Sequence, residues 1–301
     1  MAKRVIHIVF LMLLVTSVFA QVRRPRANRD TRHYFYSNLT AGYSIVFDDF
    51  DNTDEKGGFA SILGLGYSFM VPSFWFEVGA ETQLLSSYMT ITDDFSDKRV
   101  WDTEGDEVIY HYNKDLWYDR QDLVYVGIPV MFGYHHYMGF SIGAGFKYSV
   151  NVLAMARNRL QYSTSATYSD YIDDFENMPN HFYGDYDVHV SKSMSHKVMR
   201  NKFAVWLEAG YTIYNNHRNY TGMRNRHVLC RLSGYFECGI NPLIQNRDVR
   251  EMYTLNPSNP AELMNVPYYL SNSTRNKRTI PFMVGIRWTY TLATITCRTC
   301  R

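Results

Sequence analysis

Eight segments of this 301-residue chain, all after residue 40, alternate between apolar side chains and small or polar ones with a period of two. One such run is a weak indication of a β-strand, but eight runs in the same sense are a strong one. The connections between these segments alternate between short and long, and the even number of segments fits single-chain outer-membrane barrels. We therefore expect an all-β fold: an eight-stranded antiparallel transmembrane β-barrel with short periplasmic turns and long extracellular loops.

The lengths of the connections indicate which side of the barrel faces outward. If both chain ends are periplasmic, the first connection must be extracellular, and long connections should alternate with short ones. The longer connections are expected at 49–58, 91–120, 153–201 and 241–279. The shorter ones are expected at 71–73, 134–139 and 214–227.

Aromatic residues make up 16% of the chain, with 25 tyrosines among them. Many fall where the expected strands reach the periplasmic side, as the aromatic girdle of an outer-membrane barrel requires. These residues are Tyr67, Phe69, Phe74, Phe132, Tyr134, Phe140, Tyr211, Trp288 and Tyr290. The mean hydropathy of −0.31 is compatible with a barrel, because only alternate strand residues would meet lipid.

The first 20 residues have the features of a secretory signal peptide: two basic residues, an apolar core and a small-residue end before Gln21. No later apolar run approaches the roughly 20 residues of a membrane helix, which leaves a barrel or a soluble exported β-sandwich. The expected organisation is a signal peptide at 1–20, a flexible periplasmic lead at 21–32, a barrel at 33–293 and a periplasmic tail at 294–301.

Two of the expected strands carry a more specific pattern. Residues 122–134, DLVYVGIPVMFGY, place Ile-Pro inside a hydrophobic run that ends in Tyr, and residues 139–145, GFSIGAG, form a glycine-rich strand after it. This pair of segments resembles the PorT-like outer-membrane β-barrel family. The resemblance implies a Gram-negative outer-membrane barrel with no known enzymatic activity, some of whose relatives assist protein secretion.

Charged residues occur at strand positions that should face the barrel interior. An eight-stranded barrel is just wide enough for side chains to fill it, so such charges must pair or stay hydrated. We expect a salt-bridged plug, with at least one ion pair among the residues on the last three strands; a gated ion path is the alternative. The expected charges are Glu77, Glu81, Lys147, Glu208, Arg231, Glu237 and Arg287.

The remaining sequence features indicate no specific ligand or reaction. The formal net charge of +2 indicates no nucleic-acid partner, and no motif suggests a cofactor or metal. Histidines at 111, 181, 189 and 196 fall in the expected outer loops without a recognisable catalytic motif. Cys297 and Cys300 form a CxxC in the tail, which in an oxidising periplasm favours a local disulfide.

The sequence thus favours a non-enzymatic outer-membrane protein that contacts lipid and acts as a structural or interaction barrel through its loops or periplasmic face. A protein partner in the cell envelope would fit this reading. Three alternatives stay open: an accessory subunit of a secretion or envelope-assembly system, a narrow diffusion channel, and an enzyme active at the outer rim. Convergence of loop histidine and serine residues would favour the last.

Overall fold

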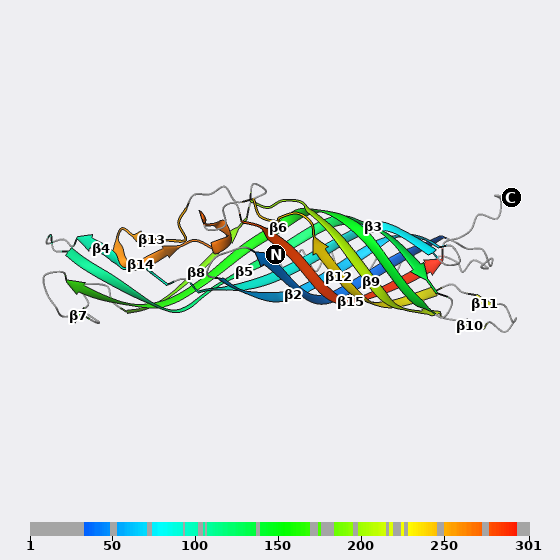
Figure 1. Ribbon diagram of the computed structural model, residues 1–301, viewed down its shortest axis with the longest axis horizontal. Coiled ribbons are helices and arrows are strands. Elements are labelled where there is room, and N and C mark those ends of the chain that lie inside the picture. Colours follow the sequence, from blue (N-terminus) through cyan, green and yellow to red (C-terminus); the bar gives the residue numbers. More distant parts are fainter. Residues whose placement is uncertain are drawn as a thin grey trace.

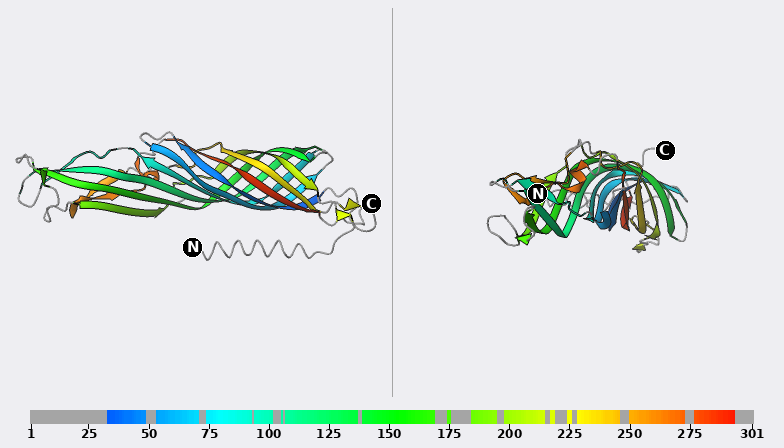
Figure 2. Two further views of the ribbon diagram at one scale, coloured as in Figure 1. Left: turned by 90° about the horizontal axis from the view of Figure 1, so that it is seen from below. Right: turned by 60° about the vertical axis from the view of Figure 1, so that its left-hand side comes forward.

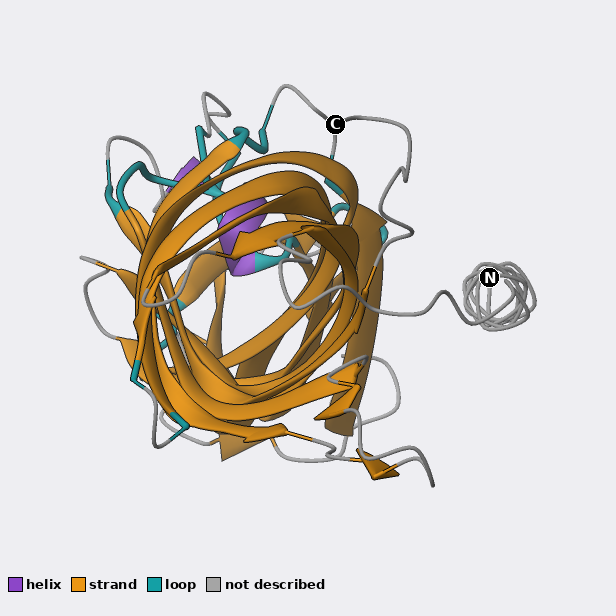
Figure 3. Ribbon diagram, turned by 90° about the vertical axis from the view of Figure 1, so that its right-hand side faces the viewer, coloured by secondary structure: helices purple, strands orange, loops and turns teal. Residues whose placement is uncertain are grey.

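Eight long strands pair side by side into one antiparallel ring in the computed structural model (Figures 1 and 3). Neighbours in the ring follow the order β5–β3–β2–β1–β15–β12–β9–β6, and the pairing of β6 with β5 returns to the start. The prediction of an all-β fold with eight antiparallel strands is confirmed. The strands are β1 (His33–Asp48), β2 (Thr53–Met70), β3 (Phe74–Ile91), β5 (Glu107–His135), β6 (Phe140–Tyr168), β9 (Lys202–Tyr214), β12 (Val228–Gly239) and β15 (Thr279–Ala293).

Shorter elements lie outside the ring. They are β4 (Lys98–Trp101), β7 (Asp174–Phe175), β8 (Gly184–Ser193), β10 (His217–Arg218), β11 (Arg224–Asn225), β13 (Tyr253–Asn256), β14 (Asn259–Asn265) and the 3₁₀ helix η2 (Tyr268–Leu270). None of the helices in the described part of the chain is long and apolar enough to cross a membrane. The structure describes residues 33–48, 53–70, 74–92, 94–101, 105, 107–136, 139–168, 174–175, 184–194, 198–214, 217–218, 224–225, 228–245, 250–272 and 277–293. The predicted signal peptide, periplasmic lead and tail lie outside these residues.

Alternate residues of the ring strands face in and out, as the period-two pattern requires. On β5, Tyr125 and Met131 are buried inside the ring, whereas Ile128 and Phe132 are exposed on its outer surface. The exposed apolar residues form a continuous band around the ring, here called the apolar belt. Its edge toward the long connections contains Phe47, Phe59, Leu84, Val126, Val152, Phe203 and Ile240, and its other edge contains Phe35, Phe74, Tyr134, Phe140, Tyr211 and Tyr290.

Strands β5 and β6 continue far past the apolar belt, toward the end with the long connections (Figures 1 and 2). There they pair with each other and with β4 and β8 in the order β4–β5–β6–β8, which we call the distal sheet. The prediction of loops over 107–120 and 153–168 was therefore wrong, and residues 53–58 are strand as well. The outward-facing side chains of these extensions are mostly polar rather than apolar, although the backbone pairing continues.

The distal sheet has an apolar core of its own, separate from the belt. Phe95 stacks on Trp117 with ring centroids 5.2 Å apart and meets Tyr253 edge-on at 4.9 Å. The Tyr162 hydroxyl accepts a hydrogen bond from the Leu263 amide at 2.7 Å, which fixes the β13–β14 hairpin on the sheet. Tyr110, Tyr112 and Trp117, predicted in a loop, are thus buried core residues, whereas Trp101 is exposed.

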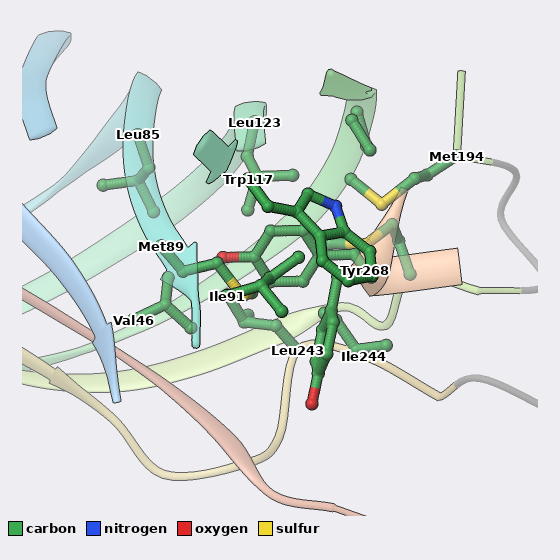
Figure 4. Packing of buried hydrophobic residues seen from close by; sticks show 14 of the residues in the cluster. Val46, Leu85, Met89, Ile91, Trp117, Leu123, Met194, Leu243, Ile244 and Tyr268 are labelled. Atoms are coloured by element: carbon green, nitrogen blue, oxygen red, sulfur yellow. The ribbon is translucent and has the colours of Figure 1, made fainter. Parts of the chain in front are cut away.

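This core continues down to the mouth of the ring. Figure 4 shows Met89 of β3 and Leu123 of β5 close to Leu243 and Tyr268 from the long connection between β12 and β15. The four side chains are at most 2% exposed. The connection therefore covers the ring mouth on the side where the distal sheet rises.

At the opposite end of the ring, the Trp75 indole packs against the backbone of Gly133 and Gly143. We expect Gly133→Ala to destabilise the fold by about 1–3 kcal/mol, because its methyl group would overlap this ring. Gly234→Ala is the matched control, since an added Cβ there meets nothing closer than 3.8 Å. Urea unfolding followed by heat-dependent gel migration measures both; equal midpoints for the two variants would contradict this packing.

Candidate functional site

The ring interior holds a cluster of buried charges on five strands. Its four acids are Glu77, Glu81, Glu208 and Glu237, and its four bases are Lys147, Lys202, Arg231 and Arg287, each at most 4% exposed. The structure places all seven charged residues expected there inside the ring and adds Lys202. With Lys202 included, the formal charges of this cluster cancel.

Two arginines form the ion pairs in the half of the cluster that lies nearer the short turns. One Nη of Arg231 contacts both carboxylate oxygens of Glu77, at 2.9 and 3.1 Å, and its Nε lies 3.0 Å from Glu208. Arg287 contacts Glu81 at 3.1 Å and Glu208 at 3.9 Å. Glu208 therefore joins the two guanidinium groups.

Aromatic rings lie against both guanidinium groups. The Arg231 guanidinium is 4.2 Å from the ring centroid of Trp75, and that of Arg287 is 4.4 Å from Trp206 and 4.2 Å from Tyr235. Arginine suits such positions because its planar, weakly hydrated group stacks on rings while its edges bind carboxylates. The rings fill space that water would otherwise occupy around the ion pairs.

Two lysines complete the other half of the cluster. The Lys147 ammonium lies 2.7 Å from Glu81 and 2.8 Å from Glu237, and it donates to the Tyr235 hydroxyl at 3.0 Å. Lys202 pairs with Glu237 and also donates to Gln83.

The eight charges form one chain in which acids and bases alternate. Its order is Glu77–Arg231–Glu208–Arg287–Glu81–Lys147–Glu237–Lys202. Because every internal member contacts two opposite charges, the desolvation of each internal group is offset on both sides. We call this arrangement the charge chain.

Lys202 is the first residue after the expected connection 153–201, but it was not counted among the inward-facing charges. Two signals in the sequence could have found it. Phe203 faces outward, so the residue before it faces inward by the period-two rule. The seven expected charges also left one carboxylate without a matching base.

A fifth buried acid, Asp119, lies outside the charge chain and beyond the apolar belt, where β5 enters the distal sheet. Its carboxylate accepts hydrogen bonds from the Asn158 side chain and the Tyr268 amide, so it joins β5 to β6 and to η2. Burial raises the pKa of Asp119 to about 7, despite these hydrogen bonds. Only the structure could show this site, because Asp119 and Tyr268 are far apart in the sequence.

The histidines of the distal sheet make polar contacts on its outer surface. His111 lies 3.1 Å from Asp97 and 3.1 Å from Thr167, and His189 lies 3.2 Å from Asp187. An Asp–His–hydroxyl order occurs in acyl-transfer enzymes, which also need converging donors for the oxyanion. Here the strand segments around His111 and Thr167 pair with each other, and this directs their amides into the sheet. Histidines 181 and 196 lie outside the described residues.

The cysteines and possible metal ligands add no site within the described residues. Cys230 and Cys238 are free thiols, and the Trp288 indole nitrogen lies 2.8 Å from the Cys230 sulfur. Across the part of the chain that the structure describes, no group of three His, Cys, Asp or Glu residues is arranged to hold a metal. Cys297 and Cys300, the expected disulfide, lie beyond the described residues.

Arg231 gives a direct test of the charge chain. Arg231→Ala leaves Glu77 without its ion pair and Glu208 with only the 3.9 Å contact to Arg287. We expect a loss of about 3–5 kcal/mol in the free energy of unfolding, as for other buried pairs that lose one partner. Lys56→Ala removes an exposed ion pair with Asp54 and should change the free energy of unfolding little. Urea unfolding of both variants measures the difference, and similar midpoints would argue against a structural role for the chain.

Asp119 should make the docking of residues 259–272 depend on pH. Its pKa in the docked state lies above the ordinary 3.8, so docking favours the protonated acid. Docking should therefore weaken as the pH rises from about 4 to 7, by up to about 1.4 kcal/mol per pH unit, and stay constant above that range.

The measurement is the rate of proteolytic cleavage within 259–272 relative to Asp119→Asn, which stays neutral at every pH. Because the same protease acts on both proteins, its own pH dependence cancels in the ratio. The ratio of wild-type to variant cleavage should rise between pH 5 and pH 8. A constant ratio would show that Asp119 does not titrate in this range.

No family model and no curated protein matches the chain. Among solved structures, Ail, the attachment invasion locus protein of Yersinia pestis, aligns at 10% identity over 86% of this chain and 99% of its own, with a TM-score of 0.27. Neisserial surface protein A aligns at 9% identity over 84% and 95%, with a TM-score of 0.29. The outer membrane protease OmpT of Escherichia coli aligns at 10% identity over 89% and 99%, with a TM-score of 0.24. All these TM-scores are below 0.5, so we base the fold on the strand pairings alone.

Proposed function

We propose that this chain is a non-enzymatic, integral outer-membrane barrel that binds another protein through its distal sheet. The apolar belt supports the membrane placement, because large apolar residues on all eight ring strands are exposed while charges fill the interior. This distribution is the reverse of that in a soluble domain and suits a barrel surrounded by lipid. The membrane would lie around the belt, with the distal sheet outside the cell.

The charge chain supports a closed interior. Its members come from five of the eight ring strands and contact one another directly across the ring. Rings such as Trp75, Trp206 and Tyr235 are buried among them. A conduction path would need hydrated space where these side chains lie, so the geometry favours a plug over a diffusion channel.

The distal sheet is the observation that carries the interaction role. Two strands of 29 residues extend beyond the belt, and the hairpin β13–β14 packs on them around a buried aromatic core. A rigid surface held away from the membrane is suited to protein recognition. Trp101, 70% exposed near the tip of this sheet, is the kind of side chain that anchors protein interfaces.

The PorT-like resemblance of residues 122–145 supports a more specific candidate within this proposal: an accessory role in secretion or envelope assembly. The segment forms the end of β5, the short turn and the start of β6, at the periplasmic side of the proposed orientation. A partner for that role would contact the periplasmic end rather than the distal sheet.

A photo-crosslinking residue at position 101 tests the interaction role in cells. We expect a discrete protein adduct from this position and none from position 286, a belt residue that would face lipid. A third position, 134, reports on the periplasmic end. An adduct from 134 alone would replace the surface interaction with the envelope-assembly role.

Planar bilayers separate both roles from the channel alternative. We expect the purified wild-type protein to insert without a steady conductance. A steady open state in the wild type would contradict the closed interior, whatever the cross-linking shows.

A further inference from the structure

A row of polar side chains crosses the outer surface of the sheet just beyond the apolar belt. Strand register places Tyr88 of β3, Arg120 of β5, Arg157 of β6 and Ser191 of β8 side by side. All four lie on the outer face, opposite the buried core. One step farther from the belt, Arg159 of β6 has the same orientation.

The two arginines in this row face each other directly. Like charges opposite one another on adjacent strands are destabilising unless an anion lies between them. Asp122 partly supplies that charge: it pairs with Arg120 at 2.9 Å, but Arg157 is 3.8 Å away. One carboxylate thus serves two guanidinium groups, and the Arg157 side chain is 49% exposed.

The third arginine is held in place by contacts of its own. Arg159 makes two hydrogen bonds to Asp187, at 3.0 and 2.7 Å, which fix its guanidinium on the same face. Arg120 is held as well, since its guanidinium lies 5.2 Å from the Tyr88 ring centroid. The cluster is therefore positioned before any ligand arrives and retains one positive charge in excess among Arg120, Arg157 and Asp122.

The distance between this row and the apolar belt, measured along the barrel axis, indicates where the row lies relative to the membrane. The last exposed belt residue on β5 is Val126, and Arg120 lies six residues farther along the strand. At about 3.4 Å per residue and a tilt of about 40°, this is roughly 15 Å along the barrel axis. Arg120 and Arg157 both approach Asp122, which is two residues nearer the belt on β5, so their guanidinium groups are directed toward the headgroup layer that borders the hydrocarbon core.

We propose that Arg120, Arg157 and Arg159 form a binding site for the phosphate group of an outer-leaflet lipid. This proposal rests on the membrane placement in the proposed function. Guanidinium groups match phosphate oxygens with paired, charge-assisted hydrogen bonds, and the Ser191 hydroxyl lies in the same row as a further donor. The acyl chains of the lipid would continue down the belt over Val126 and Val152. This continuity favours a lipid over a free anion.

The test uses full-length protein in neutral detergent and native mass spectrometry. The probes are short-chain phosphatidic acid, short-chain phosphatidylcholine and inorganic phosphate. We expect the wild type to bind phosphatidic acid more tightly than the other two. The double variant Arg120→Gln/Arg157→Gln should lose about tenfold or more in affinity for phosphatidic acid.

Arg99→Gln is the matched control. It removes the same charge from β4 in the distal sheet, where Arg99 is exposed and pairs with Glu107 at 3.5 Å. This variant should bind phosphatidic acid like the wild type. Heat-dependent gel migration shows whether each variant is folded. If the double variant does not fold, the single variant Arg157→Gln replaces it in the binding test.

Three results would overturn the site: equal phosphatidic acid affinity in wild type and arginine variants, equal affinity for the two lipids, or inorganic phosphate binding as tightly as phosphatidic acid. Insertion into vesicles of phosphatidylcholine alone is measured in parallel. Failure to insert would contradict the membrane placement. Normal insertion without a phosphate preference would overturn only the lipid site.

Discussion

The alternating chain of buried ion pairs is the constraint on which the rest of the fold depends. Four carboxylates and four cations occupy the interior of a narrow ring, and each internal member contacts two opposite charges. Removing water from such groups costs several kcal/mol each unless partners are present. Since the partners come from five strands, a slip of one strand by a single residue would turn its charges outward and leave others unpaired. The interior chemistry therefore specifies the register of the ring.

The same ring supports two outer surfaces with different chemistry. Around the ring the outer face is apolar, whereas on the extensions of β5 and β6 it carries Arg120, Arg157 and Arg159. The inner face changes as well, from ion pairs to an aromatic core around Trp117. Asp119 lies at this transition and joins the extensions to the connection that covers the ring mouth. Two continuous strands thus link a lipid-suited region to a surface suited to recognition.

The sequence predicted the parts of this architecture that depend on local alternation. Ring strands, inward charges and belt residues follow from the period of two, because one side of each strand is polar and the other apolar. The distal sheet was missed although Val108, Tyr110 and Tyr112 alternate, since aromatic residues between charges also occur in loops. Lys202 was overlooked although it lies directly after the expected connection 153–201, because the inward charges were assigned only from Phe203 onward. The contact between Asp119 and Tyr268 depends on how a long connection folds back, which no local pattern contains.

The unbroken course of β5 and β6 has a mechanical consequence. The two strands pair from Val108 and Tyr168 at the tip to His135 and Ser141 at the short turn, with only two register shifts on the way. A tensile load on the tip, directed along β5 and β6, would act on their hydrogen bonds with the neighbouring ring strands in shear. Hydrogen bonds loaded in this direction share the force and must rupture together, whereas bonds loaded from one end open one after another. A pull on the distal sheet would therefore be carried into the ring wall as a whole, rather than opening the sheet one bond at a time from its tip.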